Sequence, residues 1–166
     1  MRNDINTLNG SLGVNNSGGA GVILSTDNPV ITTGGGVNDG QVSGVIRGYQ
    51  LDKRGSGVLS LAGANAYTNF TYLTAGSIVL NAPAAIPVTS TVIFYNQNAV
   101  LDLHGYNLTL YGLGGSVGKV TNSSPDEVTL TIAHGGGNRF GGLIEDGNGR
   151  LNLTKSGVGT AFLENR

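Results

Sequence analysis

The chain repeats itself, imperfectly, after about 100 residues, and repetition of this kind is typical of proteins built as arrays. Residues 43–46 (SGVI) return as residues 141–144 (GGLI), and residues 51–57 (LDKRGSG) return as residues 153–159 (LTKSGVG). The order of the copies is kept while their spacing drifts slightly, as small insertions would cause. We therefore predict a single domain over 1–166, made of about one and a half imperfect repeats of about 100 residues.

The segments between the turns read as short strands. Residues 58–61 (VLSL), 77–80 (SIVL), 99–103 (AVLDL) and 128–132 (VTLTI) alternate apolar and polar side chains, and each stops at glycine, asparagine or proline. No segment keeps a helical period of 3.6 over three turns, so we predict little or no helix. Either an antiparallel sandwich or a parallel β-solenoid could hold such strands, and the long-range repetition favours the solenoid.

A solenoid places alternate strand residues in one shared interior column. We expect this interior to hold a set of aliphatic side chains: Leu59, Leu61, Ile78, Leu80, Leu101, Leu103, Leu108 and Leu110. At about 20 to 25 residues per coil, the length predicts about seven coils. Glycine and asparagine suit the corners because they tolerate the left-handed backbone region.

Composition excludes several classes of protein. Only 11% of the residues are charged, the net charge is −1 and the basic residues are scattered, which argues against binding to a phosphate backbone. There is no cysteine, so disulfides and thiolate metal sites are excluded. No apolar run is long enough to span a membrane as a helix. Met1 is not followed by an apolar export signal, which fits either a removed signal or assembly inside a cell.

The order of several motifs resembles one known family. Residues 51–68 (LDKRGSGVLSLAGANAYT) and 73–80 (LTAGSIVL) resemble the passenger-associated repeat of autotransporters, which reads KxGxGTLTLxGxNxYTG and then TxxxGTLxL. Residues 100–110 (VLDLHGYNLTL) and 112–122 (GLGGSVGKVTN) resemble the segments that follow it. Asn69 and Phe70 depart from it, because the family often has two glycines there.

The resemblance implies a right-handed parallel β-helix displayed outside a cell, with a structural or adhesive role and no catalytic site. The right-handed sense also agrees with the general rule for parallel crossovers. A virion fibre or capsid decoration protein is an alternative structural role, and a β-helix enzyme acting on carbohydrate is an alternative of another class. We expect an extracellular or bacterial cell-surface location, or a virion surface under the first alternative.

Patterns that suggest catalysis or metal binding have ordinary interpretations here. Residues 114–118 match GxSxG around Ser116, yet no helix pattern follows, so we expect a coil corner. Asp102 and His104 lie two residues apart on one strand and lack a third ligand nearby. The acid pairs at 126–127 and 145–146 border turns and do not gather in one groove. We predict no catalytic, cofactor or metal site.

Two contact regions are predicted instead. Tyr67, Phe70 and Tyr72 cluster in sequence and are candidates for contact with carbohydrate or a partner, although aromatic packing over a corner is the commoner arrangement. Open solenoid ends expose unpaired strand edges, so we expect the ends to meet copies of the chain or a partner subunit. Cell-surface or capsid proteins and glycans are further partner classes, and neither nucleic acid nor membrane insertion is expected.

Overall fold

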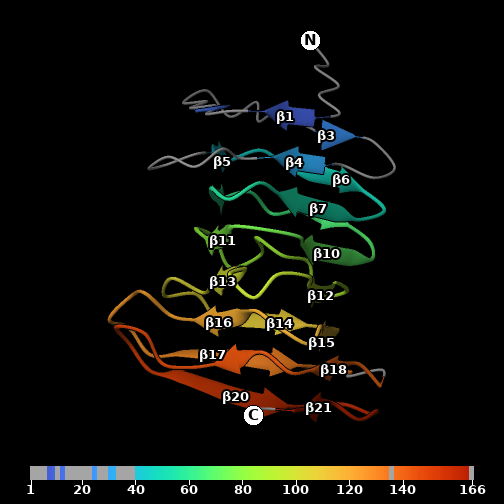
Figure 1. Ribbon diagram of the computed structural model, residues 1–166, viewed down its shortest axis with the longest axis vertical. Helices are drawn as coiled ribbons and strands as arrows, with labels where there is room; N and C mark the ends of the chain where they lie inside the picture. The colour runs from blue at the N-terminus through green and yellow to red at the C-terminus, as the bar shows by residue number, and fades with distance from the viewer. Residues whose placement is uncertain are drawn as a thin grey trace.

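The protein is a parallel β-solenoid of about six turns, close to the seven coils predicted from its length. The computed structural model describes residues 40–134 and 137–164, together with strands at 7–9, 12–13, 24–25 and 30–32. Figure 1 shows the strands stacked like rungs from the N-terminal to the C-terminal end. Among the described residues there is no helix, and hence none that could cross a membrane.

Two long sheets run along the stack, and all their strand pairs are parallel. Sheet I has six strands: β1 (Thr7–Asn9), β4 (Val30–Thr32), β7 (Leu51–Arg54), β10 (Phe70–Leu73), β12 (Thr91–Phe94) and β15 (Gly112–Gly114). Sheet II has seven: β2 (Leu12–Gly13), β5 (Gly40–Val42), β8 (Val58–Leu61), β11 (Ser77–Leu80), β13 (Val100–Asp102), β16 (Lys119–Thr121) and β19 (Leu143–Ile144).

The third side of the solenoid is divided. Sheet III contains β3 (Leu24–Ser25), β6 (Ile46–Gly48) and β9 (Ala66–Tyr67), and sheet IV contains β14 (Leu108–Leu110), β17 (Val128–Ile132) and β20 (Leu151–Lys155). Sheet V pairs β18 (Arg139–Phe140) with β21 (Phe162–Leu163), and a bridge from Gly115 to Phe140 joins it to sheet I. The chain therefore visits each side once per coil.

Sheets III and IV are separated by residues 82–90, which form turns where a third strand would otherwise lie. Pro83 and Pro87 lack the N–H that a ladder needs, so strand pairing fails there. Ala85 and Ile86 are nevertheless buried and fill the interior at this level. The coil is thus closed by turns and side-chain packing.

The interior column consists of side chains from every second strand residue. All eight aliphatic side chains predicted to be inside are at most 1% exposed, which confirms that expectation. The alternation is visible in β8 and β11, where Leu59, Leu61, Ile78 and Leu80 point inward and their neighbours are half-buried. Stacking of like strands therefore builds one continuous hydrophobic core.

Two buried asparagines connect neighbouring coils at the corners. Asn65 Oδ1 accepts from the Ile46 backbone N–H (2.8 Å), and Asn65 Nδ2 donates to the Ala85 carbonyl (2.6 Å). In the C-terminal half, Asn122 Oδ1 accepts from the Gly105 N–H (3.0 Å) and its amide donates to the Asp126 carbonyl (2.6 Å). Each asparagine satisfies backbone groups that a corner leaves outside the ladders.

Candidate functional site

Two of the three predicted aromatic contacts lie together on the outer face of β10. Phe70 and Tyr72 are two residues apart on this strand, so their side chains point to the same side. Their rings stack with centroids 5.3 Å apart and planes 26° apart. Both are partly exposed, and they form the beginning of an aromatic surface.

Tyr67 does not belong to this surface, because its side chain is inside the solenoid and only 1% exposed. Its hydroxyl lies 2.6 Å from Thr71 Oγ1, which lies 2.8 Å from Ser90 Oγ. Burial raises the pKa of the Tyr67 phenol well above its usual value, although the hydrogen bonds from Thr71 and Ser90 partly oppose this. The prediction that Tyr67 contacts a ligand is corrected: in β9 Ala66 points outward and Tyr67 inward.

Tyr95 takes the third place in the cluster. It follows β12 in the next coil, is 63% exposed, and its ring lies 5.7 Å from that of Tyr72. A hydrogen bond from the Tyr95 N–H to the Leu73 carbonyl (3.0 Å) fixes the two coils in register. We call Phe70, Tyr72 and Tyr95 the aromatic cluster. Sequence proximity did not reveal Tyr95, because the register pairs Tyr72 with Ile93 and Tyr95 lies two residues further along the next coil.

Polar groups border the aromatic cluster. Asp52 pairs in register with Tyr72, and its carboxylate accepts from Arg54 Nε (2.6 Å) and Thr74 Oγ1 (2.7 Å). The pKa of Tyr72 is raised, mainly by burial and then by Tyr95, Tyr49 and Asp52 nearby. The cluster therefore offers flat rings with phenol hydroxyls and a guanidinium beside them, a combination suited to sugar rings or to a polar protein surface.

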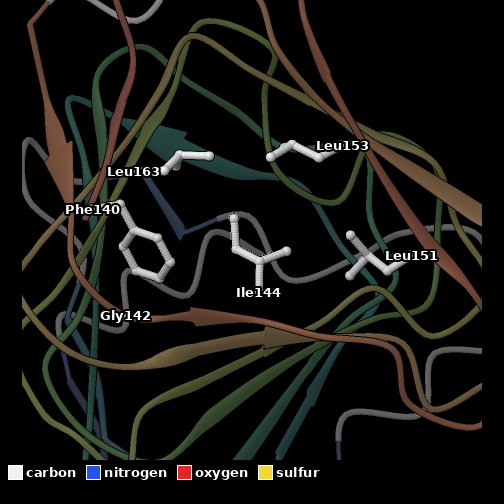
Figure 2. Close-up of a pocket in the computed structure, with 6 residues that line it drawn as sticks. All are labelled: Phe140, Gly142, Ile144, Leu151, Leu153 and Leu163. Carbon is white, nitrogen blue, oxygen red and sulfur yellow. The ribbon is translucent and has the colours of Figure 1, made fainter. Parts of the chain in front are cut away.

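The C-terminal end of the stack carries a second surface of a different kind. A pocket of about 270 Å³ is lined by residues of the last coil: Phe140, Gly142, Ile144, Leu151, Leu153 and Leu163. Figure 2 shows the side chains arranged around this space. Leu153 and Leu163 are 40% and 47% exposed, so the end face is apolar and open.

The remaining sequence candidates lie in corners and turns. Ser116 is exposed between β15 and β16, next to Gly115 (φ 109°), in the coil corner that the sequence predicted. His104 lies in a turn, where its ring Nδ1 is 2.9 Å from Ser123 Oγ. The backbone N–H of His104 donates to Asp102 Oδ1. The His104 ring thus contacts the neighbouring coil, and its backbone N–H bonds to Asp102 beside its own turn.

The acidic side chains are dispersed in the same way. Glu145 pairs with Lys119 across two coils of sheet II (3.1 Å), and Asp126 accepts from the Ser124 hydroxyl within its own turn (2.9 Å). Asp146 accepts from the Leu151 N–H at 2.7 Å. The structure does not bring these carboxylates together in one group.

Comparison with known proteins finds similarity to one large adhesin. The chain is 30% identical over 158 residues to the adhesin BmaC autotransporter of Brucella suis biovar 1 (strain 1330). The match covers 90% of this chain but spans only 4% of the length of that protein. No family model matches the chain. No solved structure matches it either.

Proposed function

We propose that this chain is a non-catalytic segment of an adhesive surface solenoid, similar to an autotransporter passenger and displayed outside a bacterial cell. The proposal is carried by one combination: a stacked parallel β-solenoid whose sequence is similar, over most of its length, to an autotransporter adhesin. A rod of this kind presents a long surface, and function then resides in patches on that surface.

The aromatic cluster is the patch that we assign to contact. Tyr95 of this cluster is 63% exposed, and Tyr49, which lies near enough to Tyr72 to influence its pKa, is 54% exposed. Exposed aromatic side chains gathered in this way are typical of a contact surface. Tyrosine and arginine are enriched where proteins bind other surfaces, because they combine apolar area with a polar group. Phe70 and Tyr72 lie on β10, and Tyr95 directly follows β12 with its N–H bonded to the Leu73 carbonyl. The backbone beneath the rings is thus already ordered, so little conformational freedom is lost when they bind.

Binding of the purified chain to epithelial cells and to a glycan panel tests this function. We expect saturable binding, and we expect Tyr72→Ala with Tyr95→Ala to weaken it about tenfold or more. Tyr111→Ala is the matched control, because Tyr111 is 40% exposed but lies on another coil and stacks on His134. Absence of binding by the unmodified chain would contradict an adhesive role, whereas full binding by the double variant would contradict only the role of the cluster. Cleavage of a polysaccharide would contradict the non-catalytic assignment.

A further inference from the structure

The outer face of sheet I carries a column of side chains that crosses three successive coils. Arg54, Thr74 and Tyr95 each directly follow or end the positions at which β7, β10 and β12 pair in register, so they occupy equivalent places on neighbouring coils. Successive coils are about 4.8 Å apart, which puts the first and last backbone positions about 10 Å apart. We call these three residues the Thr74 column. Tyr72 lies beside it on β10, and the Tyr72 ring is 5.7 Å from the ring of Tyr95.

The two ends of the Thr74 column are exposed, and its middle is short. The Arg54 side chain is 56% exposed and Tyr95 is 63% exposed. Thr74 is half-buried between them, and its hydroxyl donates to Asp52 Oδ1 (2.7 Å). A ligand on this column therefore meets a guanidinium at one end, a phenol at the other and a small polar side chain between them.

The Arg54 guanidinium is held in place through only one of its nitrogens. Its Nε donates to Asp52 Oδ2 (2.6 Å), and the described residues supply no acceptor for the two terminal amino groups. The Asp52 side chain is only 11% exposed, so the exposed part of this ion pair is positive. A guanidinium anchored through Nε presents Nη1 and Nη2 to a carboxylate in the two-bonded geometry that arginine favours.

Positive charge is confined to the first coil of the column. Residues 46–54 hold three basic residues and one acid, Asp52, whereas residues 55–101 contain no charged side chain. The strands β10 and β12 and the turns around them are therefore uncharged. Complementarity of charge then favours a ligand with a negative group at its Arg54 end and neutral polar groups along the rest.

We propose that the Thr74 column binds the end of an acidic glycan, in which a terminal sugar of the sialic acid type is joined to neutral pyranoses. This inference rests on the contact role proposed above for the aromatic cluster, and it adds the chemical class of the ligand. The carboxylate binds Nη1 and Nη2 of Arg54. The neutral ring that follows lies over Thr74 with its C–H face against Tyr72, and the next ring lies against Tyr95.

The groups on the column match those of such a glycan. A sugar ring has both C–H and O–H groups, and a tyrosine offers an apolar ring face together with a hydroxyl that donates and accepts. A polysaccharide with a carboxylate on every sugar fits less well, because its inner carboxylates would lie unpaired over the uncharged coils of β10 and β12. The single exposed guanidinium thus selects one terminal acid.

Titration of the purified chain with three matched sugars tests the ligand class. Sialyllactose carries one terminal carboxylate on a neutral disaccharide, its methyl ester lacks the charge, and lactose lacks the acidic sugar. Binding is followed by the NMR signals of the Tyr72 and Tyr95 rings. We expect sialyllactose to bind about tenfold or more tightly than its methyl ester, because only the carboxylate pairs with Arg54. Equal binding of the acid and the ester would overturn the proposal.

Variants locate that preference. Arg54→Gln should abolish it, so that acid and ester bind alike, whereas Arg54→Lys should keep part of it because the charge remains. Tyr95→Ala should weaken acid and ester by the same factor. Arg150→Gln is the matched control, since Arg150 is an exposed arginine directly before β20, and it should change neither. A preference that survives Arg54→Gln in folded protein contradicts the assignment, and the comparison of acid with ester decides the matter even if that variant does not fold.

Sialidase treatment of epithelial cells separates this inference from the adhesive role. We expect the treatment to reduce cell binding about tenfold or more. Binding that survives sialidase but is lost when Tyr72 and Tyr95 are both changed to alanine would identify a different partner, such as an acidic protein surface. That result would overturn the glycan assignment and leave the adhesive role standing. Absence of cell binding together with an intact preference for the acid would contradict the adhesive role alone.

Discussion

The segments that begin at Leu51 and at Leu153 share a sequence motif, but they differ in burial. In both, the lysine ammonium donates to the backbone carbonyls one and two residues further on. Leu51 and Lys53 are 0% exposed, whereas Leu153 is 40% exposed and Lys155 is exposed. The first copy lies on sheet I and the second on sheet IV, so the motif adopts its local structure on either side of the solenoid. The comparison teaches that the motif determines the turn, while the next coil determines whether the residues become core.

The largest expected difference between the two coils concerns their leucines. Leu51→Ala should lower the free energy of unfolding by about 2–5 kcal/mol, because it opens a cavity in a fully buried column. Leu153→Ala should cost about 1 kcal/mol, because part of its surface is already in water. Urea unfolding of the two variants measures the difference. Equal losses would show that both leucines contribute alike, which would break the comparison.

The lysines give a smaller effect that sharpens the same contrast. Lys53→Met should destabilise the fold by about 1–3 kcal/mol, because it removes the donor from carbonyls held in a covered site. Lys155→Met should change stability by no more than about 0.5 kcal/mol, as exposed substitutions usually do. Thermal unfolding at neutral pH is the measurement. A destabilising Lys155→Met would mean that the exposed turn depends on its lysine as strongly as the covered one.

Alkaline pH tests the buried phenol of Tyr67, which lies in the same coil as Leu51. This is the smallest expected effect, because the free energy of unfolding changes only above about pH 10. The folded phenol of Tyr67 keeps its proton above pH 10.0, its ordinary pKa, whereas the unfolded one releases it. The free energy of unfolding should therefore be unaffected by this group at neutral pH and fall by about 1.4 kcal/mol per pH unit above 10. Urea unfolding of the wild type and of Tyr67→Phe should differ in this slope. Identical slopes would place the Tyr67 hydroxyl in contact with water.

Much of the fold was predictable from local pattern. The alternation in β8, β11 and β13 identified the inward aliphatic side chains, and the glycine-rich pattern identified the corner at Ser116. This works because a solenoid strand pairs with strands of similar pattern, so the two-residue period alone decides which side chains are inside. His104 was expected on one strand with Asp102, but β13 ends at Asp102 and His104 lies in the turn that follows.

Features that depend on contacts between coils were not predictable in the same way. Tyr67 was grouped with its sequence neighbours. In a two-residue strand such as β9, no local pattern shows whether Ala66 or Tyr67 points inward. Tyr95 was missed because its contact with Tyr72 is made across coils. The burial of Lys53 was likewise hidden, since a lysine is normally exposed and its acceptor at Ala75 lies one coil away.

The turns at 82–90 have a mechanical consequence. Sheets I and II run past this level without interruption, but the third side has no ladder joining β9 to β14. Neighbouring coils of a solenoid separate most easily where few backbone hydrogen bonds join one coil to the next. The two proline-bearing turns leave this level joined by two ladders in place of three, with hydrogen bonds from Asn65 to the Ala84 and Ala85 carbonyls on the third side. We therefore expect separation of neighbouring coils to begin here.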